Sequence, residues 1–263
     1  MPAPNVLAVA AVPPPLLRAA TPRTMGGAVP DLLTTADRPR TTSLGAPTTT
    51  ARGAEAAVVA VDVDCSLEPN PIVCENGKPG SPPSEWDLPG GKLDGLDATP
   101  GAGDPSIQGF ATDISVAPGQ PVAFKINTPA SSYRIDIYRL GFYDFDGARK
   151  IASILPSATL PQVQPACMVD SARGLVDCGN WGVSASWTVP ASAVSGVYLA
   201  KLVRTDGPTG ASHIVFIVRD DTGRSDLLFQ TSDTTWQAYN DYGGASLYKS
   251  TLSPIGRAYA VSY

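Results

Sequence analysis

Apolar and polar residues alternate in several short segments between residues 105 and 221. In QPVAFKINT, the apolar Val122, Phe124 and Ile126 alternate with Ala123, Lys125 and Asn127. An alternation with a period of two residues is typical of a strand with one buried and one solvent-exposed face. This segment therefore predicts a half-buried strand.

The segment YRIDIYRL, residues 133–140, repeats the pattern with larger side chains. One face would carry Tyr133, Ile135, Ile137 and Arg139, and the other Arg134, Asp136, Tyr138 and Leu140. VSASWTVP, GVYLAKLVRTD and SHIVFIVRDD continue the series, and the loop GPTGA between the last two suits a hairpin. With 25 glycines, 26 prolines and only 16% charged residues, the composition also favours strands joined by turns.

We therefore predict a mainly β protein in which residues 65–222 form an immunoglobulin-like or jelly-roll-type β-sandwich. Residues 78–106 have no periodicity, and we expect a long irregular loop there, near the N-terminal end of this domain.

The pattern changes after residue 222. DLLFQ resembles a short buried strand, and TSDTTWQAYNDYGG begins with capping residues and ends at a glycine pair, as a short helix would. A strand followed by a helix is how an α/β domain begins. Residues 223–263 are too few to form such a core alone, so we expect the start of an incomplete α/β domain.

Residues 1–64 are rich in Ala, Thr and Pro, and residues 1–60 contain no aromatic residue and no lysine. A segment of this composition buries little apolar surface, and we expect a disordered leader. It contains no convincing signal peptide, and an organellar presequence is an alternative.

No apolar stretch is long enough for a membrane span, and a net charge of −5 without a basic cluster argues against a nucleic-acid partner.

The four cysteines, Cys65, Cys74, Cys167 and Cys178, form two local pairs with eight and ten residues between the partners. Neither pair has the spacing or the histidines of a zinc site. We predict two disulfides, paired by proximity, and hence a secreted or extracytoplasmic protein. Four buried free thiols are the alternative.

The best candidate site lies in the predicted C-terminal helix. Trp236, Tyr239 and Asn240 are spaced i, i+3 and i+4, so one helix face would carry an indole, a phenol and an amide. This face is either a pocket wall or core packing. The single histidine, His213, opens a predicted strand and is interpreted as structural, and SLYK at 246–249 matches S-x-x-K without the accessory motifs of serine acylases.

The chain resembles bacterial proteins of the N,N-dimethylformamidase beta (large) subunit-like family over about residues 65–263. Eight segments carry the resemblance in order: NPIVCENGKPGSPPSEWD, GDPSIQGFATDISVAPGQPVAFKI, SYRIDIYRLGFY, DGARK, GLVDCGNW, SGVYLAKLVRTDG, SHIVFIVRDD and SDLLFQTSDTTWQAYNDYGGASLY. The resemblance implies a β-sandwich followed by a glutamine-amidotransferase-like α/β domain. The characterised amidase of the family uses one iron held by two tyrosines and a glutamate. The resemblance implies Tyr239 as the first tyrosine, with the other two ligands beyond Tyr263.

We therefore expect a fragment of a secreted protein whose parent is a metal-assisted amide (C–N) hydrolase acting on an unknown small amide. The fragment would be inactive and hold no cofactor alone, the parent would hold iron, and further β-domains or subunits are expected partners. The alternative is a non-catalytic extracellular module that binds carbohydrate or protein, for which the four tryptophans would provide stacking surfaces.

Overall fold

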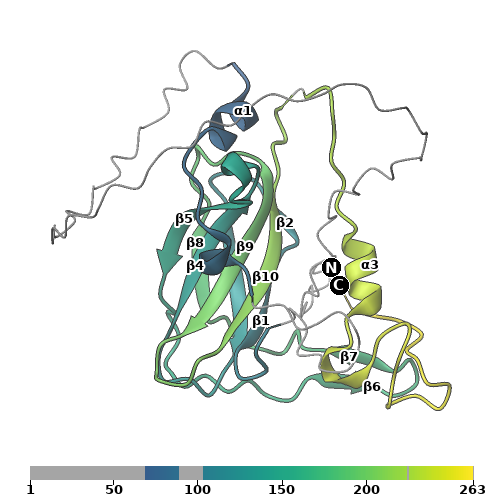
Figure 1. The fold of residues 1–263 in the computed structure, drawn as a ribbon. Coiled ribbons are helices and arrows are strands. Elements are labelled where there is room, and N and C mark those ends of the chain that lie inside the picture. Colours follow the sequence, from purple (N-terminus) through teal and green to yellow (C-terminus); the bar gives the residue numbers. More distant parts are fainter. Residues whose placement is uncertain (1–68, 89–102, 224, 263) are drawn as a thin grey trace, which may run out of the picture. The chain divides into compact units, whose positions relative to one another are not determined.

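The computed structural model of this chain describes residues 69–88, 103–223 and 225–262 (Figure 1). The predicted leader, residues 1–64, lies outside the described residues, as do Cys65 and most of the second half of the predicted irregular loop. The described residues are mainly β.

Ten strands and five short helices make up the described structure. The strands are β1 (Gln108–Ala111), β2 (Ser115–Val116), β3 (Pro121–Asn127), β4 (Tyr133–Leu140), β5 (Ala148–Ile154), β6 (Met168–Asp170), β7 (Leu175–Asp177), β8 (Ala185–Thr188), β9 (Gly196–Arg204) and β10 (Ala211–Val218). The helices are α1 (Pro71–Asn76), α2 (Pro83–Trp86), η2 (Tyr143–Phe145), α3 (Asp233–Tyr239) and η3 (Tyr242–Gly244).

The strands form three sheets. The larger sheet has the order β2-β10-β9-β4-β5, the second has the order β1-β3-β8, and β6 pairs only with β7. All pairs are antiparallel except β2 with β10. The hairpin predicted between the last two strands of the series is confirmed, because β9 and β10 are antiparallel neighbours across residues 205–210.

One hydrophobic core lies between the larger sheet and the three-stranded sheet. Val122, Phe124 and Ile126 of β3 point into it, as the alternation of QPVAFKINT predicted, and they meet Ile135 and Ile137 of β4 there. The alternation in YRIDIYRL predicted that one face of β4 is exposed to solvent, but β4 is buried on both faces from Ile135 to Arg139. A second layer therefore covers the outer face of this sheet.

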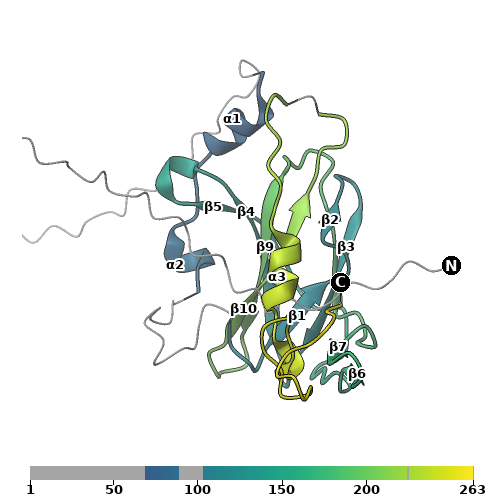
Figure 2. The same cartoon turned by 90° about the vertical axis from the view of Figure 1, so that its right-hand side faces the viewer.

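Residues 71–88, which we call the strap, form that second layer. Figure 2 shows α1 and α2 on one side of the β4–β9–β10 layer and β3 on the other. The indole of Trp86 packs against Tyr138, Ala148 and Leu199, on the sheet face opposite to the main core. Within the predicted irregular loop 78–106, Pro83–Trp86 is thus a helical turn, because its tryptophan is fixed by the apolar outer face of the sheet.

Polar groups of the larger sheet also hold the strap. Lys201 donates hydrogen bonds to the carbonyl oxygens of Glu85 (2.8 Å) and Asp87 (3.0 Å), and His213 Nε2 lies 2.7 Å from the carbonyl oxygen of Trp86. Since His213 is buried inside β10, burial lowers its pKa to about 4. A neutral His213 therefore serves to hold the strap, which is consistent with its structural interpretation.

The segment DLLFQ is not a buried strand, so that prediction was wrong. Residues 225–230 form no bridge with any other described strand, and the side chains of Leu227, Leu228 and Phe229 are 88%, 94% and 82% exposed. The residue types favour a strand, but a strand of this kind needs neighbours on both edges and cover on both faces. Within the described residues it has neither.

Candidate functional site

The predicted C-terminal helix is present as α3, which ends at Tyr239 and is followed by the short turn η3 up to Gly244. The helix starts after Ser232, whose carbonyl oxygen accepts hydrogen bonds from the amides of Thr235 and Trp236. Gly243 adopts a φ of 78°, and the position of a Cβ there would lie 2.6 Å from the Val176 side chain. A glycine is therefore required where the chain turns against β7.

The three candidate side chains, of which Asn240 caps the C-terminal end of α3 with an extended backbone, do not line one common cavity. Trp236 lines a small cavity together with Ile114 and residues of β10, on the side of the larger sheet. Asn240 lines another, of about 20 Å³, together with Cys178 and Tyr242. That volume holds about one water molecule and no small amide.

Tyr239 lines neither of these two cavities. Its side chain is 57% exposed, and its ring stacks on Tyr248 with the centroids 4.2 Å apart and the planes 18° from parallel. The hydrogen bond with Tyr248, and the charge of that residue, raise the pKa of Tyr239. Since an iron-bound tyrosine is a phenolate, a raised pKa disfavours the ligand form at neutral pH.

Tyr248 is the neighbour that the helical spacing could not indicate, because it comes from the loop that follows η3. It belongs to the SLYK segment. There, Ser246 Oγ accepts hydrogen bonds from the backbone amides of Tyr248 (3.3 Å) and Lys249 (3.0 Å), while the Lys249 side chain is exposed. Ser246 thus closes a backbone turn, which agrees with the interpretation of this motif as chance.

The described residues do not fit an iron held by two tyrosines and a glutamate. Two phenols are adjacent at Tyr239 and Tyr248, but the sequence contains no glutamate after Glu85. Glu75, on the strap, is bound to Arg149 and Lys78, whose positive charges lower its pKa against the effect of burial. Among the described residues no three His, Cys, Asp or Glu side chains gather into a metal-binding group.

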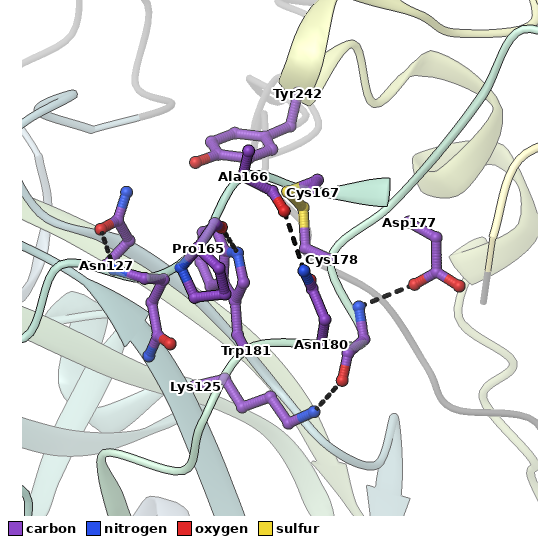
Figure 3. Close-up of a disulfide and its surroundings, with 12 residues drawn as sticks. Lys125, Asn127, Pro165, Ala166, Cys167, Asp177, Cys178, Asn180, Trp181 and Tyr242 are labelled. Carbon is purple, nitrogen blue, oxygen red and sulfur yellow. Dashed lines mark hydrogen bonds between the residues drawn. A yellow bond between two sulfur atoms is a disulfide. The ribbon is translucent and has the colours of Figure 1, made fainter. Parts of the chain in front are cut away.

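The disulfide between Cys167 and Cys178 is confirmed (Figure 3). It closes a loop that is also held by hydrogen bonds from Asn180 Nδ2 to the Ala166 carbonyl (2.8 Å) and from Trp181 Nε1 to the Pro165 carbonyl (3.0 Å). Cys74 is buried and is not a free thiol. Its predicted partner, Cys65, lies outside the described residues.

Comparison with known families gives a match over the C-terminal half of the chain. Residues 134–263 match the model of the family described as N,N-dimethylformamidase beta subunit-like, C-terminal. Through this segment the chain belongs to the N,N-dimethylformamidase beta subunit-like family. The matched range starts in β4 and includes β9, β10, the disulfide and the whole C-terminal segment of this family member. No curated protein matches the chain.

The cellular location of this family member is constrained only in part. A structural disulfide is consistent with an extracytoplasmic protein. In the described part of the chain, no helix is both long and apolar enough to span a membrane.

Proposed function

We propose that this chain supplies the β-rich scaffold of a secreted amide (C–N) hydrolase and has no hydrolase activity alone. In this proposal the two sheets that share a core are a β-sandwich, and residues 225–262 belong to a glutamine-amidotransferase-like α/β domain, in which residues 226–230 would become a strand only beside partner elements. The other groups that bind iron, and those that bind the small amide, come from elements outside the described residues.

The exposure of Leu227, Leu228 and Phe229 is the observation that carries this proposal. Successive residues of a strand point to opposite faces, so three consecutive exposed apolar side chains leave apolar surface on both faces. If the segment bound in a groove of another protein, only one of its two faces would be covered. An interior strand of an α/β sheet is covered on both, which is why such strands are continuous apolar runs.

The candidate residues of α3 agree with a scaffold role. Tyr239 lacks a glutamate partner in its neighbourhood, and the cavity beside Asn240 has a volume of only about 20 Å³. In the complete domain, the partner elements would bring the remaining ligands to Tyr239. We propose no reaction step for this chain by itself.

The tryptophans give little support to the alternative of a carbohydrate-binding module. Trp86, Trp181 and Trp187 are 8%, 4% and 7% exposed, so they are packing residues and present no flat face to a sugar. Trp236 is half-buried against the larger sheet.

Two measurements test the proposal. The purified chain, with and without added iron, is incubated with N,N-dimethylformamide and other small amides, and amine release is followed. We expect no release above background. Turnover by this chain that is lost in Tyr239→Phe would contradict the scaffold role.

The second measurement uses an apolar dye whose fluorescence rises on exposed hydrophobic surface. We expect the double variant Leu228→Ser/Phe229→Ser to bind much less dye than the wild type. Leu155→Ser is the matched control, because Leu155 is 74% exposed but lies at the end of β5. Equal dye binding by both variants would show that residues 227–229 are not the unpartnered surface.

A further inference from the structure

The C-terminal segment, residues 233–262, rests on a hairpin that the disulfide closes. We call residues 165–181, which include β6 and β7, the disulfide hairpin. The ring of Tyr242 packs edge-on against Trp181 at a centroid distance of 5.7 Å, and Gly243 lies against Val176. Further along, the amide of Tyr259 donates a 2.8 Å hydrogen bond to the carbonyl oxygen of Arg173. Three separate points of the segment thus contact this hairpin.

Besides the disulfide, the hydrogen bonds from Asn180 and Trp181 across the loop and a short strand pairing hold the disulfide hairpin. Strands β6 and β7 have three residues each, and their sheet is not hydrogen-bonded to either larger sheet. Met168 and Val169 of β6 are both 51% exposed, so β6 buries little apolar surface. A two-stranded hairpin of this size is marginally stable in water. The covalent bond that closes the loop is therefore an important constraint on its conformation.

The same bond lies inside the contact with the C-terminal segment. Cys178 is 1% exposed and forms a small apolar cluster with Phe110 and Trp181, against which Tyr242 packs. Figure 3 shows the disulfide with Trp181 and Tyr242 beside it. The main core between the sheets contains none of these residues. Loss of the bond would therefore disturb the platform of the C-terminal segment and leave the main core intact.

We propose that the Cys167–Cys178 disulfide is a redox-sensitive lock, and that a dithiol reductant releases residues 233–262 from the body of the protein. Cys167 is partly buried and Cys178 is 1% exposed, so Cys167 is the more accessible of the two cysteines. One thiolate of the dithiol attacks Cys167 Sγ, and the bond to Cys178 breaks, leaving the electron pair on Cys178 Sγ, which takes up a proton. The second thiolate of the dithiol resolves the mixed disulfide and frees Cys167 as a thiol. The protein gains two electrons and two protons, and the dithiol becomes a cyclic disulfide.

The release has a consequence for Trp236 and Tyr239, because both lie on α3 within the released segment. Their placement against the larger sheet and against Tyr248 would exist only in the oxidised protein. A protein that passes from a reducing to an oxidising compartment would thus order this segment on arrival. This inference concerns the order of the segment and is independent of whether the scaffold proposal holds.

Amide hydrogen exchange, read peptide by peptide, tests the lock. The double variant Cys167→Ser/Cys178→Ser is compared with the wild type, and Cys65→Ser/Cys74→Ser is the matched control that removes the other two cysteines. We expect residues 233–250 to exchange at least about tenfold faster in the first variant, with unchanged rates in β9 and β10. The control should keep wild-type rates at residues 233–250.

A second variant separates the bond from the contact. In Tyr242→Ala, which keeps the disulfide, residues 233–250 should also exchange faster, and a dithiol should add little further change. Wild-type exchange at residues 233–250 in the cysteine variant would overturn the proposal. So would an equal acceleration in β9 and β10, because the bond would then hold the whole fold together.

Discussion

Acidification should weaken the fold through His213, and the effect can be worked out from its burial. The ordinary pKa of histidine is 6.5, and burial lowers the pKa of His213 to about 4. Above pH 6.5 the residue is neutral in both states and contributes no pH dependence. Below pH 6.5 the unfolded chain binds a proton that the folded chain does not bind until about pH 4, so the free energy of unfolding falls over this range.

The magnitude follows from the width of that range. Each pH unit between the two pKa values costs about 1.4 kcal/mol, so the whole range from pH 6.5 to about 4 costs about 3 kcal/mol. The neighbours of the imidazole are Lys201, whose charge further lowers the pKa of His213, and Asp87, whose charge raises it. Hydrogen bonds and nearby positive charges lower the pKa values of the buried carboxyl groups of Glu75 and Asp136 against the effect of burial.

Urea unfolding of the wild type and of His213→Gln at several pH values between 7 and 5 measures this effect. Glutamine can still donate to the carbonyl oxygen of Trp86 but does not titrate. We expect the wild type to lose about 2 kcal/mol between pH 6.5 and 5, and the variant to lose little. Equal losses in both proteins would refute the assignment of this pH dependence to His213.

Two other perturbations test the strap and the tyrosine pair. Trp86→Ala should lower the free energy of unfolding in urea by about 3 to 5 kcal/mol, because a large buried ring is lost. Phe145→Ala, at a side chain that is 84% exposed, should lower it by less than about 0.5 kcal/mol. Similar losses in both variants would show that the strap is not packed on the sheet. Tyr248→Phe should lower the pKa of Tyr239, because the hydrogen bond and the charge of Tyr248 are both removed. In a spectrophotometric pH titration, tyrosinate absorbance should then begin to rise at a lower pH. An unchanged titration would show that the two phenols do not interact in solution.

Local patterns predicted the strands well because the order of apolar and polar residues within a strand reflects which of its faces is buried. The alternation around Phe124 identified the core face of β3, and the alternation in YRIDIYRL placed Ile135 and Tyr138 on opposite faces of β4, although both faces are buried. What covers the second face of β4 could not be read from that segment. The cover is Trp86, more than 50 residues earlier in a stretch without periodicity.

The candidate site shows the same limit. Helical spacing placed Trp236 and Tyr239 on α3, with Asn240 directly after it, but did not indicate their environment, which depends on β10, on Tyr248 and on the disulfide hairpin. The apolar run that includes Leu228 predicted a buried strand because propensity and hydrophobicity agree there. Burial needs partner elements, and the described residues provide none.

Amide hydrogen exchange at Leu227, Leu228 and Phe229 in the isolated, oxidised chain tests the scaffold proposal most directly. The proposal predicts exchange within about tenfold of the rates of an unfolded peptide, because no element within the described residues pairs with this segment or covers it. Exchange as slow as that of the β9 amides would contradict it, since the segment would then already be paired and covered within this chain.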